Sequence, residues 1–301
     1  CLEAFNWCRC CAKPRDRRGL ASPKYRCHNM NVSLHETVLR KLTTSLPVSR
    51  DVTANDLNGA LRLLAKWRSV LIQNTLLRDS GTIVGQGPFR GLDFLEQSSE
   101  GCHIPKLLGC YEQPIHGHIQ AAVLQNYDVV LNIGCAEGYY AAGFARLMPT
   151  AHVHAFDTNE AAQKACRVLA EKNAVVDRVH IGGLFGHDDF KAFSVQKTLV
   201  FCDIEGAEAD LLDPAAAPDL AHMDIIVESH EGMRPGLTVA LRERFASSHD
   251  ITLVEDNGHR ALADMPAWFL ALGHLDQLLA TWEWRSGPTP WLEKNARRRM
   301  R

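Results

Sequence analysis

The chain has 301 residues, of which 46% are hydrophobic and 23% charged, and its formal net charge is −2. This length and composition can supply the core of one large domain with an appendage, or of two small domains. The near-neutral charge argues against a protein that binds nucleic acid irrespective of sequence, because such a protein needs a net basic face. No hydrophobic run reaches the roughly 18 residues that a membrane span needs, and no secretory signal pattern is found. We therefore expect a cytoplasmic protein that binds neither membranes nor nucleic acid.

The 10 cysteines fall into two groups. Five are scattered beside glycines or within apolar runs, which is typical of small buried side chains in a reduced compartment. These are Cys102, Cys110, Cys135, Cys166 and Cys202. The other five lie between Cys1 and Cys27.

The N-terminal cysteines allow two interpretations. One is a zinc site, although the cysteine spacing does not match the usual C-x2-C pair. Its ligands would be Cys8, Cys10 or Cys11, Cys27 and His28. The other, which we favour, is that residues 1–29 are a disordered basic tail or translated upstream sequence, with the native start at Met30.

Residues 30–127 predict a helical extension and a segment that approaches the main domain. Hydrophobic residues recur at intervals of three and four over residues 33–46 and 55–77, which indicates two amphipathic helices. The second helix has Thr53 or Asn55 as a candidate cap. Its apolar face contains Leu57, Leu61, Leu64, Trp67 or Val70, and Leu71.

The approach segment contains several glycines and prolines. Residues 81–94 are expected to form loops and short strands, and they are a candidate lid over a binding site. Arg90 in this segment is a candidate contact for an anionic substrate. Residues 105–115 are expected to form a loop that leads into a helix over residues 115–125.

From residue 128 onward, apolar runs alternate with amphipathic segments. Strands are expected at residues 129–133, 152–156, 179–181, 198–202, 224–227 and 251–254, with helices at 139–147, 160–173 and 237–247. Near-continuous apolar strands separated by helices indicate a mostly parallel sheet covered on both faces. We therefore expect a doubly wound α/β domain over residues 128–273, with residues 268–272 as a candidate further strand. Residues 274–301 are expected to form a C-terminal helix and a basic tail.

The first strand-to-helix turn, within VVLNIGCAEGYYAAGFA at residues 129–145, contains two glycines. In such sheets ligands bind beyond the carboxyl ends of the strands, and this turn supplies backbone N–H groups. Gly134 and Gly138 let the chain approach a ligand where a Cβ would clash. The dinucleotide fingerprint G-x-G-x-x-G is incomplete, because Ala136 stands at its third position. Asp157 follows the next strand, where its carboxylate can accept both hydroxyls of a ribose.

The fourth strand ends in LVFCDIEGAEADLLDP, where Asp203, Glu205 and Glu208 surround a glycine. Carboxylates in this position would repel a phosphate-rich ligand and suit a cation. With this cluster, NIGCAEGYYAAGFA, AFDTN, DIEGAE and IIVESHE resemble the class I S-adenosylmethionine-dependent methyltransferases, specifically the FkbM-type family. The resemblance covers roughly residues 81–291. It implies a seven-stranded Rossmann-like methyltransferase fold that binds S-adenosyl-L-methionine and methylates a small molecule.

The resemblance also assigns roles to residues of the cofactor site. Gly134, Ala136 and Gly138 would line the methionine part of the cofactor, Asp157 would bind its ribose, and Asp203 would close the site near the sulfonium. Asn132 stands where many relatives carry an acidic residue, so the charge partner of the cofactor's ammonium falls to Glu137 or Asp203. Asp188, in the loop after the third strand, is the candidate for the adenine amino group. The alternative interpretations are a helix cap at the strand end for Asp157 and a solvated loop for Asp203 and Glu205.

Methyl transfer from a sulfonium is an in-line displacement, so the protein mainly has to align the nucleophile with the methyl group. A hydroxyl acceptor also needs a base. Among His230, Glu205, Glu228 and Glu231 we favour His230, whose ordinary pKa is nearest neutrality, although a packing histidine is an equal alternative. Together with Asp203 and Glu205 it forms the predicted catalytic group.

Three further interpretations stay open. No metal is expected, but Asp203, Glu205, Glu228 and His230 would hold a divalent cation if the two strand ends converged. An NAD(P)-linked oxidoreductase would use the same architecture. A noncatalytic scaffold that binds the cofactor would be consistent with Asn132. The acceptor by default is a hydroxyl of a sugar or secondary metabolite.

Overall fold

The computed structural model describes residues 33–46, 51–98, 102–285, 287 and 289–297. The N-terminal zinc site and tail considered above lie outside the described residues. The chain forms two compact units, residues 1–68 and residues 69–301. Neither unit contains a described helix that is long and apolar enough to cross a membrane.

In the first unit, the two predicted helices are confirmed as α1 (Leu34–Ser45) and the first part of α2 (Ala54–Ser80). Thr53 and Asp56 exchange hydrogen bonds at the start of α2, in the reciprocal pattern of a capping box. The apolar face predicted for α2 is largely exposed in the described structure. The exposed fractions of its leucines are 57% for Leu57, 67% for Leu61 and 40% for Leu64.

The second unit is built on a seven-stranded sheet with the order β3-β2-β1-β4-β5-β7-β6. Its strands are β1 (Val129–Ile133), β2 (His152–Phe156), β3 (Val179–Gly182), β4 (Thr198–Cys202), β5 (Asp224–Glu228), β6 (His249–Val254) and β7 (Trp291–Ala296). Strands β1 to β5 run parallel, whereas β7 is antiparallel to both β5 and β6. The predicted mostly parallel α/β sheet is therefore confirmed.

The seventh strand is not where the sequence predicted it. Residues 268–272 are not a strand, because Ala267–Leu270 forms the short helix α9 directly after a proline. The strand is β7, in the segment predicted as a helix and a tail, so the sheet extends beyond residue 273. The charged residue Lys294 interrupts the apolar pattern that would have predicted this strand. Its side chain is nevertheless fully buried, with Nζ 4.2 Å from the centre of the Phe245 ring. Burial lowers the pKa of Lys294 to about 7, which eases the cost of placing this amine in the interior.

The loop predicted at residues 105–115 is partly wrong as well. His103–Leu108 forms helix α3, followed by the 3₁₀ turn η1 (Gln113–Ile115) and α4 (His116–Val123). Pro105 lies in the first turn of α3, where a missing N–H costs no intrahelical hydrogen bond. Gly109 ends the helix in the left-handed region, at φ 75°.

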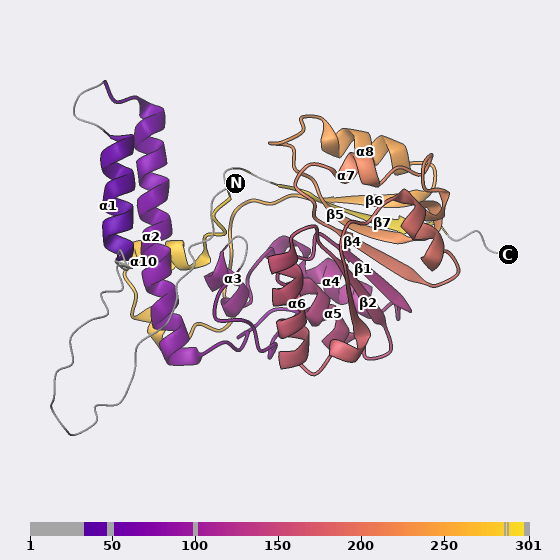
Figure 1. Cartoon of the computed structure of the whole chain (residues 1–301), viewed down its shortest axis with the longest axis horizontal. Helices are drawn as coiled ribbons and strands as arrows, with labels where there is room; N and C mark the ends of the chain where they lie inside the picture. Colours follow the sequence, from indigo (N-terminus) through magenta and orange to yellow (C-terminus); the bar gives the residue numbers. More distant parts are fainter. Residues whose placement is uncertain (1–32, 47–50, 99–101, 286, 288, 298–301) are drawn as a thin grey trace, which may run out of the picture. The chain divides into compact units, whose positions relative to one another are not determined.

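Helices cover both faces of the sheet (Figure 1), with α7 and α8 on one face and α4, α5 and α6 on the other. The remaining helical elements are α5 (Tyr139–Leu147), α6 (Glu160–Lys172), η2 (Val176–Arg178), η3 (His187–Phe193), α7 (Glu208–Leu211), η4 (Pro218–His222), α8 (Leu237–Phe245) and α10 (His274–Thr281). Each face has its own hydrophobic cluster. The candidate ligand site lies at the carboxyl ends of β1, β2, β4 and β5.

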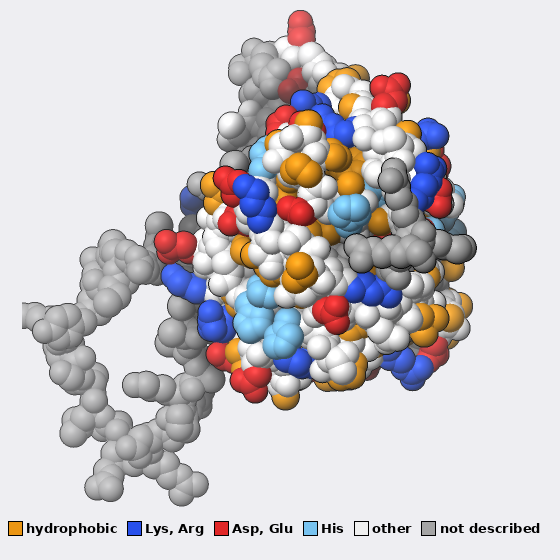
Figure 2. All heavy atoms as spheres, turned by 90° about the vertical axis from the view of Figure 1, so that its right-hand side faces the viewer, with side chains coloured by type: hydrophobic (Ala, Val, Ile, Leu, Met, Phe, Trp, Pro, Cys, Tyr) orange, Lys and Arg blue, Asp and Glu red, His pale blue; other side chains and the backbone are white. Residues whose placement is uncertain are grey.

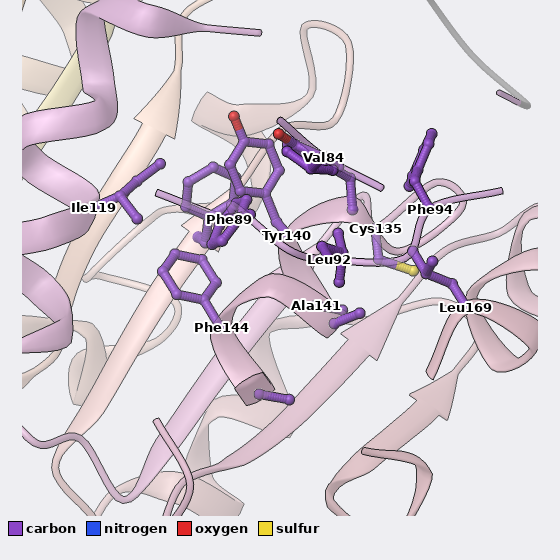
Figure 3. Close-up of a cluster of buried hydrophobic side chains, with 14 of the residues drawn as sticks. Val84, Phe89, Leu92, Phe94, Ile119, Cys135, Tyr140, Ala141, Phe144 and Leu169 are labelled. Carbon is purple, nitrogen blue, oxygen red and sulfur yellow. The ribbon is translucent and has the colours of Figure 1, made fainter. Parts of the chain in front are cut away.

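The candidate lid at residues 81–94 is part of the core. Phe89, Leu92 and Phe94 are buried, and Figure 3 shows Phe89 beside Tyr140 and Phe144 of α5, with Phe94 nearer to Leu169. Ring centroids of Phe89 and Phe144 lie 5.7 Å apart in an edge-to-face arrangement. This segment therefore anchors α5, the helix that follows the glycine turn.

The structure also shows the distribution of charged side chains on one face and the state of five cysteines. Figure 2 shows acidic and basic side chains interspersed on the face that it draws. The five cysteines predicted to be buried and unpaired are all buried free thiols.

Candidate functional site

The turn after β1 is shaped by two glycines in the left-handed region, Gly134 at φ 79° and Gly138 at φ 87°. A Cβ on Gly134 would lie 1.7 Å from the backbone oxygen of Asp203, and a Cβ on Gly138 would lie 2.6 Å from Sγ of Cys166. Between them, Ala136 also has a positive φ, 45°. The glycines thus allow the turn to pass directly against the end of β4 and against α6.

Asp157 follows β2 and ties the glycine turn to it. Its Oδ2 accepts the N–H of Ala136 at 2.9 Å, and its Oδ1 accepts the N–H of Asn159 at 2.8 Å. A carboxylate offers about four acceptor positions, so these two bonds leave room for ligand hydroxyls. The structure therefore places Asp157 beside the turn, where its carboxylate also holds the turn in position, while its role in binding a ribose stays a prediction.

Asn132 and Glu137 lie on either side of the turn, and both are buried. The side-chain oxygen of Asn132 has no hydrogen-bond partner among the described residues, which is costly for a buried polar atom and marks a place for a donor. Glu137, in contrast, is paired with Lys106 Nζ at 2.5 Å and accepts a hydrogen bond from Ser98. Of the two, Asn132 is therefore the better candidate to contact a ligand.

Acidic side chains and one histidine converge at the carboxyl ends of β4 and β5. Nε2 of His230 lies 3.6 Å from Oδ1 of Asp203, 3.6 Å from Oε2 of Glu228 and 3.9 Å from Oε2 of Glu205. Its Nδ1 contacts Oε1 of Glu208 at 2.7 Å. The carboxylate of Glu208 therefore fixes the orientation of the ring and directs Nε2 at the other three acids.

The charges in this cluster shift several pKa values. Burial and the negative charges of Glu228 and Glu112 hold the pKa of Asp203 well above its usual range. Burial lowers the pKa of His230, but the hydrogen bond to Glu208 and the charge of Glu228 outweigh it, so the net pKa is raised. The site holds an excess of negative charge and favours any cation that enters it.

Glu205 and Asp188 are the most peripheral of the predicted residues. Glu205 has a positive φ of 55°, and its side chain is 65% exposed. The side chain of Asp188 is 92% exposed and pairs with Lys191 at 2.7 Å. The structure brings Glu205 to the edge of the cluster, and it does not bring Asp188 to it.

Sequence reasoning missed a buried network that adjoins the cluster. Arg285, in the connection between β6 and β7, pairs with Glu228 and with Glu112, the latter at 2.5 Å. Tyr140 donates a hydrogen bond to Glu112. Burial and the charge of Glu228 raise the pKa of Glu112 to about 7, against the opposing effect of Arg285. No motif signals these residues, because they meet only through the placement of β7.

Three ligand-type atoms in this cluster lie close enough to share a cation. One atom each from Asp203, Glu228 and His230 lie within 4.8 Å of one another. Two carboxylates and an imidazole are suitable donors for a divalent ion. The convergence that the sequence left open is therefore present.

Comparisons with known proteins add the following findings. No protein-family model matches the chain. A release factor glutamine methyltransferase of Flavobacterium psychrophilum is 30% identical over 118 residues, which are 39% of this chain and 40% of that protein. The match therefore spans less than half the length of this curated relative, and the FkbM assignment stays a prediction.

Solved structures of low sequence identity are also similar to the chain. Cofactor-bound Rv0187 from MTB has a TM-score of 0.43 at 14% identity, covering 85% of this chain and 95% of that one. An O-methyltransferase from Bacillus cereus in complex with SAH has a TM-score of 0.39 at 14% identity, with coverages of 88% and 90%. For TomG from Streptomyces achromogenes, solved with SAM, the TM-score is 0.42 at 15% identity, with coverages of 62% and 79%. The chain's own sheet, in which β7 runs against the other six strands, has the expected Rossmann-like methyltransferase fold.

Proposed function

We propose that this protein is an S-adenosylmethionine-dependent methyltransferase of the FkbM type that methylates a hydroxyl of a small molecule, such as a sugar or a secondary metabolite. The observation that carries the proposal is the crowding of Asp203, Glu205 and Glu228 around His230 at the ends of β4 and β5. Such a site stabilises a positively charged ligand and repels a pyrophosphate. The identity to a methyltransferase over 118 residues supports methyl transfer as the reaction.

The residues of the turn fit the cofactor. The unpartnered oxygen of Asn132 suits an ammonium donor, and the carboxylate of Asp157 retains acceptor positions for a ribose. Gly134 and Ala136 have little or no side chain, so mainly backbone atoms of the turn lie beside Asn132 and Asp157. Bound there, S-adenosylmethionine supplies a methyl group on a positively charged sulfur. Asp203, whose pKa is raised by burial and by Glu228 and Glu112, would ionise beside the sulfonium and compensate its charge.

His230 is the proposed general base. Its Nδ1–H is held by Glu208, so Nε2 is the nitrogen that can accept the proton of the acceptor hydroxyl. Its raised pKa makes it a stronger base but keeps it protonated to higher pH. Proton acceptance therefore requires a pH above that pKa.

The base is tested by replacing His230 with glutamine. We expect the turnover rate to fall by about 10²-fold or more, because a positioned base contributes on that scale, while cofactor affinity changes little. His222→Gln is the matched control, since His222 is exposed on η4. Unchanged turnover in His230→Gln would remove this residue from the mechanism.

The electrostatic argument has its own test, in which Asp203→Asn is compared with wild type for binding of S-adenosylmethionine and S-adenosylhomocysteine. Only the first carries the sulfonium charge, so its affinity should fall by about tenfold more, equivalent to about 1.4 kcal/mol. Asp177→Asn, at an exposed position on η2, is the control. An equal loss for both ligands would contradict the role of charge.

A second candidate use of the same site follows from the convergence of Asp203, Glu228 and His230. A divalent cation held by these groups would orient two neighbouring acceptor oxygens and acidify one of them. In that case Nε2 is a ligand and not a base. Loss of activity with EDTA and its recovery with magnesium would favour this use; activity that is indifferent to the chelator would exclude it.

Calorimetry and activity assays distinguish the two remaining alternatives from the proposed function. An oxidoreductase would bind NADH and ignore S-adenosylhomocysteine, whereas the proposed function requires the reverse. A noncatalytic scaffold would bind the cofactor without transferring its methyl group to any member of a library of small hydroxylated acceptors. Methyl transfer to one such acceptor rejects the scaffold.

A further inference from the structure

Three histidines meet on β2 and β3, apart from the acidic cluster. His154 of β2 is the register partner of His180 of β3, and His152 precedes His154 by two residues on the same strand. Residues two apart on a strand point to the same face, and register partners on neighbouring strands stand side by side. The backbone therefore directs all three imidazoles to one face of this strand pair.

The rings are in contact with one another. Nδ1 of His152 lies 3.0 Å from Nε2 of His180, with the ring planes 17° apart. The ring centroids of His154 and His180 are 4.8 Å apart, and the edge of His154 is held against Phe193 at 4.8 Å. The cluster is also accessible, since His152 and His180 are exposed and His154 is half-buried.

The separation of the first two nitrogens matches that of two ligands on one metal ion. With metal–nitrogen bonds of about 2.05 Å, two nitrogens lie roughly 2.9 Å apart at a right angle and roughly 3.3 Å apart at a tetrahedral angle. The observed 3.0 Å falls between these values. Without an ion, one of these two nitrogens donates a hydrogen bond to the other. A metal ion would replace the shared proton, and the ring of His154 would have to turn about its side-chain bonds to add a third nitrogen.

We propose that His152, His154 and His180 form a binding site for a divalent transition-metal ion such as nickel, copper or zinc. Imidazole nitrogens favour these ions, whereas the oxygen-rich cluster of Asp203 and Glu228 favours magnesium or manganese. The histidine cluster would therefore select different ions from those that the acidic cluster would hold. This second site is independent of the methyl-transfer chemistry.

An ion bound at the histidine cluster would connect the edge strand β3 to its neighbour β2. β3 lies at the end of the strand order, and among the described residues it pairs only with β2. An ion held by two side chains of β2 and one of β3 acts as a clip across this last pair, and it stabilises the folded state because the unfolded chain lacks the arrangement. Binding should therefore slow hydrogen exchange at the backbone N–H groups of β3.

The test is a calorimetric titration of the full chain with nickel chloride, comparing wild type with His180→Gln and His154→Gln. Because other groups in the chain can also bind nickel, the readout is the difference between variants. We expect His180→Gln to lose one equivalent of bound nickel and His154→Gln to bind that equivalent at least tenfold more weakly. His222→Gln, which removes an exposed histidine outside the cluster, should match wild type.

A second measurement separates site-specific binding from binding elsewhere. Nickel should slow amide exchange in β3 in wild type and leave it unchanged in His180→Gln. Magnesium should have no such effect on either protein. The proposal is overturned if His180→Gln or His154→Gln binds nickel like wild type, or if nickel leaves exchange in β3 of wild type unaltered.

Discussion

Replacing Gly134 with alanine tests the closest contact in the site. The new Cβ would lie 1.7 Å from the backbone oxygen of Asp203, half of the 3.4 Å at which ordinary contact begins. The turn would have to move away from β4, which endangers the hydrogen bond from the N–H of Asp203 to the carbonyl of Ile133, 3.0 Å long. Each lost backbone hydrogen bond costs about 1–3 kcal/mol, and the positive φ costs about 1–2 kcal/mol. We expect about 4 kcal/mol of destabilisation.

Gly236→Ala is the matched control for this substitution. Gly236 has φ 83°, close to the 79° of Gly134, but nothing lies within 4 Å of a Cβ added there. It should lose only the conformational part, about 1–2 kcal/mol. Urea unfolding followed by circular dichroism measures both values. Equal losses in the two variants would refute the reasoning that the turn is pressed against β4.

Three further predictions concern buried charge. Lys106→Met removes the positive charge that faces Glu137 and should destabilise the protein by about 3–5 kcal/mol in urea unfolding. Adding Glu137→Gln should restore most of the loss. Because the pKa of Glu112 is raised to about 7, its ionisation costs stability as the pH rises from 4.5 through 7. Glu112→Gln should flatten this pH dependence, and the exposed Glu243→Gln should not. If His230 is the base, kcat/KM should rise with pH through a midpoint above 6.5, the ordinary pKa of histidine; a midpoint below it would contradict the assignment.

Local patterns in the sequence predicted most of the parallel sheet. Val129–Ile133 and Thr198–Cys202 are buried on both faces and read as continuous apolar runs, so their positions follow from composition alone. Trp291–Ala296 escaped prediction because Glu293 and Lys294 make it look polar and because its partners lie far back along the chain. Pro105 likewise hid a helix that tolerates it only in its first turn.

The candidate site was predictable to the extent that its residues follow strand ends. Asp203 and Asp157 could be placed because each directly follows a predicted strand. The approach of His230 to Asp203 depends on β4 and β5 being neighbours, which is a property of the strand order and not of either segment. Arg285 depends on β7 in the same way. Short motifs therefore identify the components of such a site, whereas tertiary topology decides which of them meet.

The connection between β6 and β7 is longer than the sheet requires. Val254 and Trp291 are register partners in an antiparallel pair, and a two-residue turn can join such strands. The intervening residues instead deliver Arg260, Glu283 and Arg285 to the interior, where Arg285 neutralises Glu112 and Glu228. A shortened hairpin would preserve the strand topology but would leave Glu112 and Glu228 without the positive charge of Arg285. The balance of charge at the ends of the parallel strands thus depends on a connecting segment whose described residues form no strand.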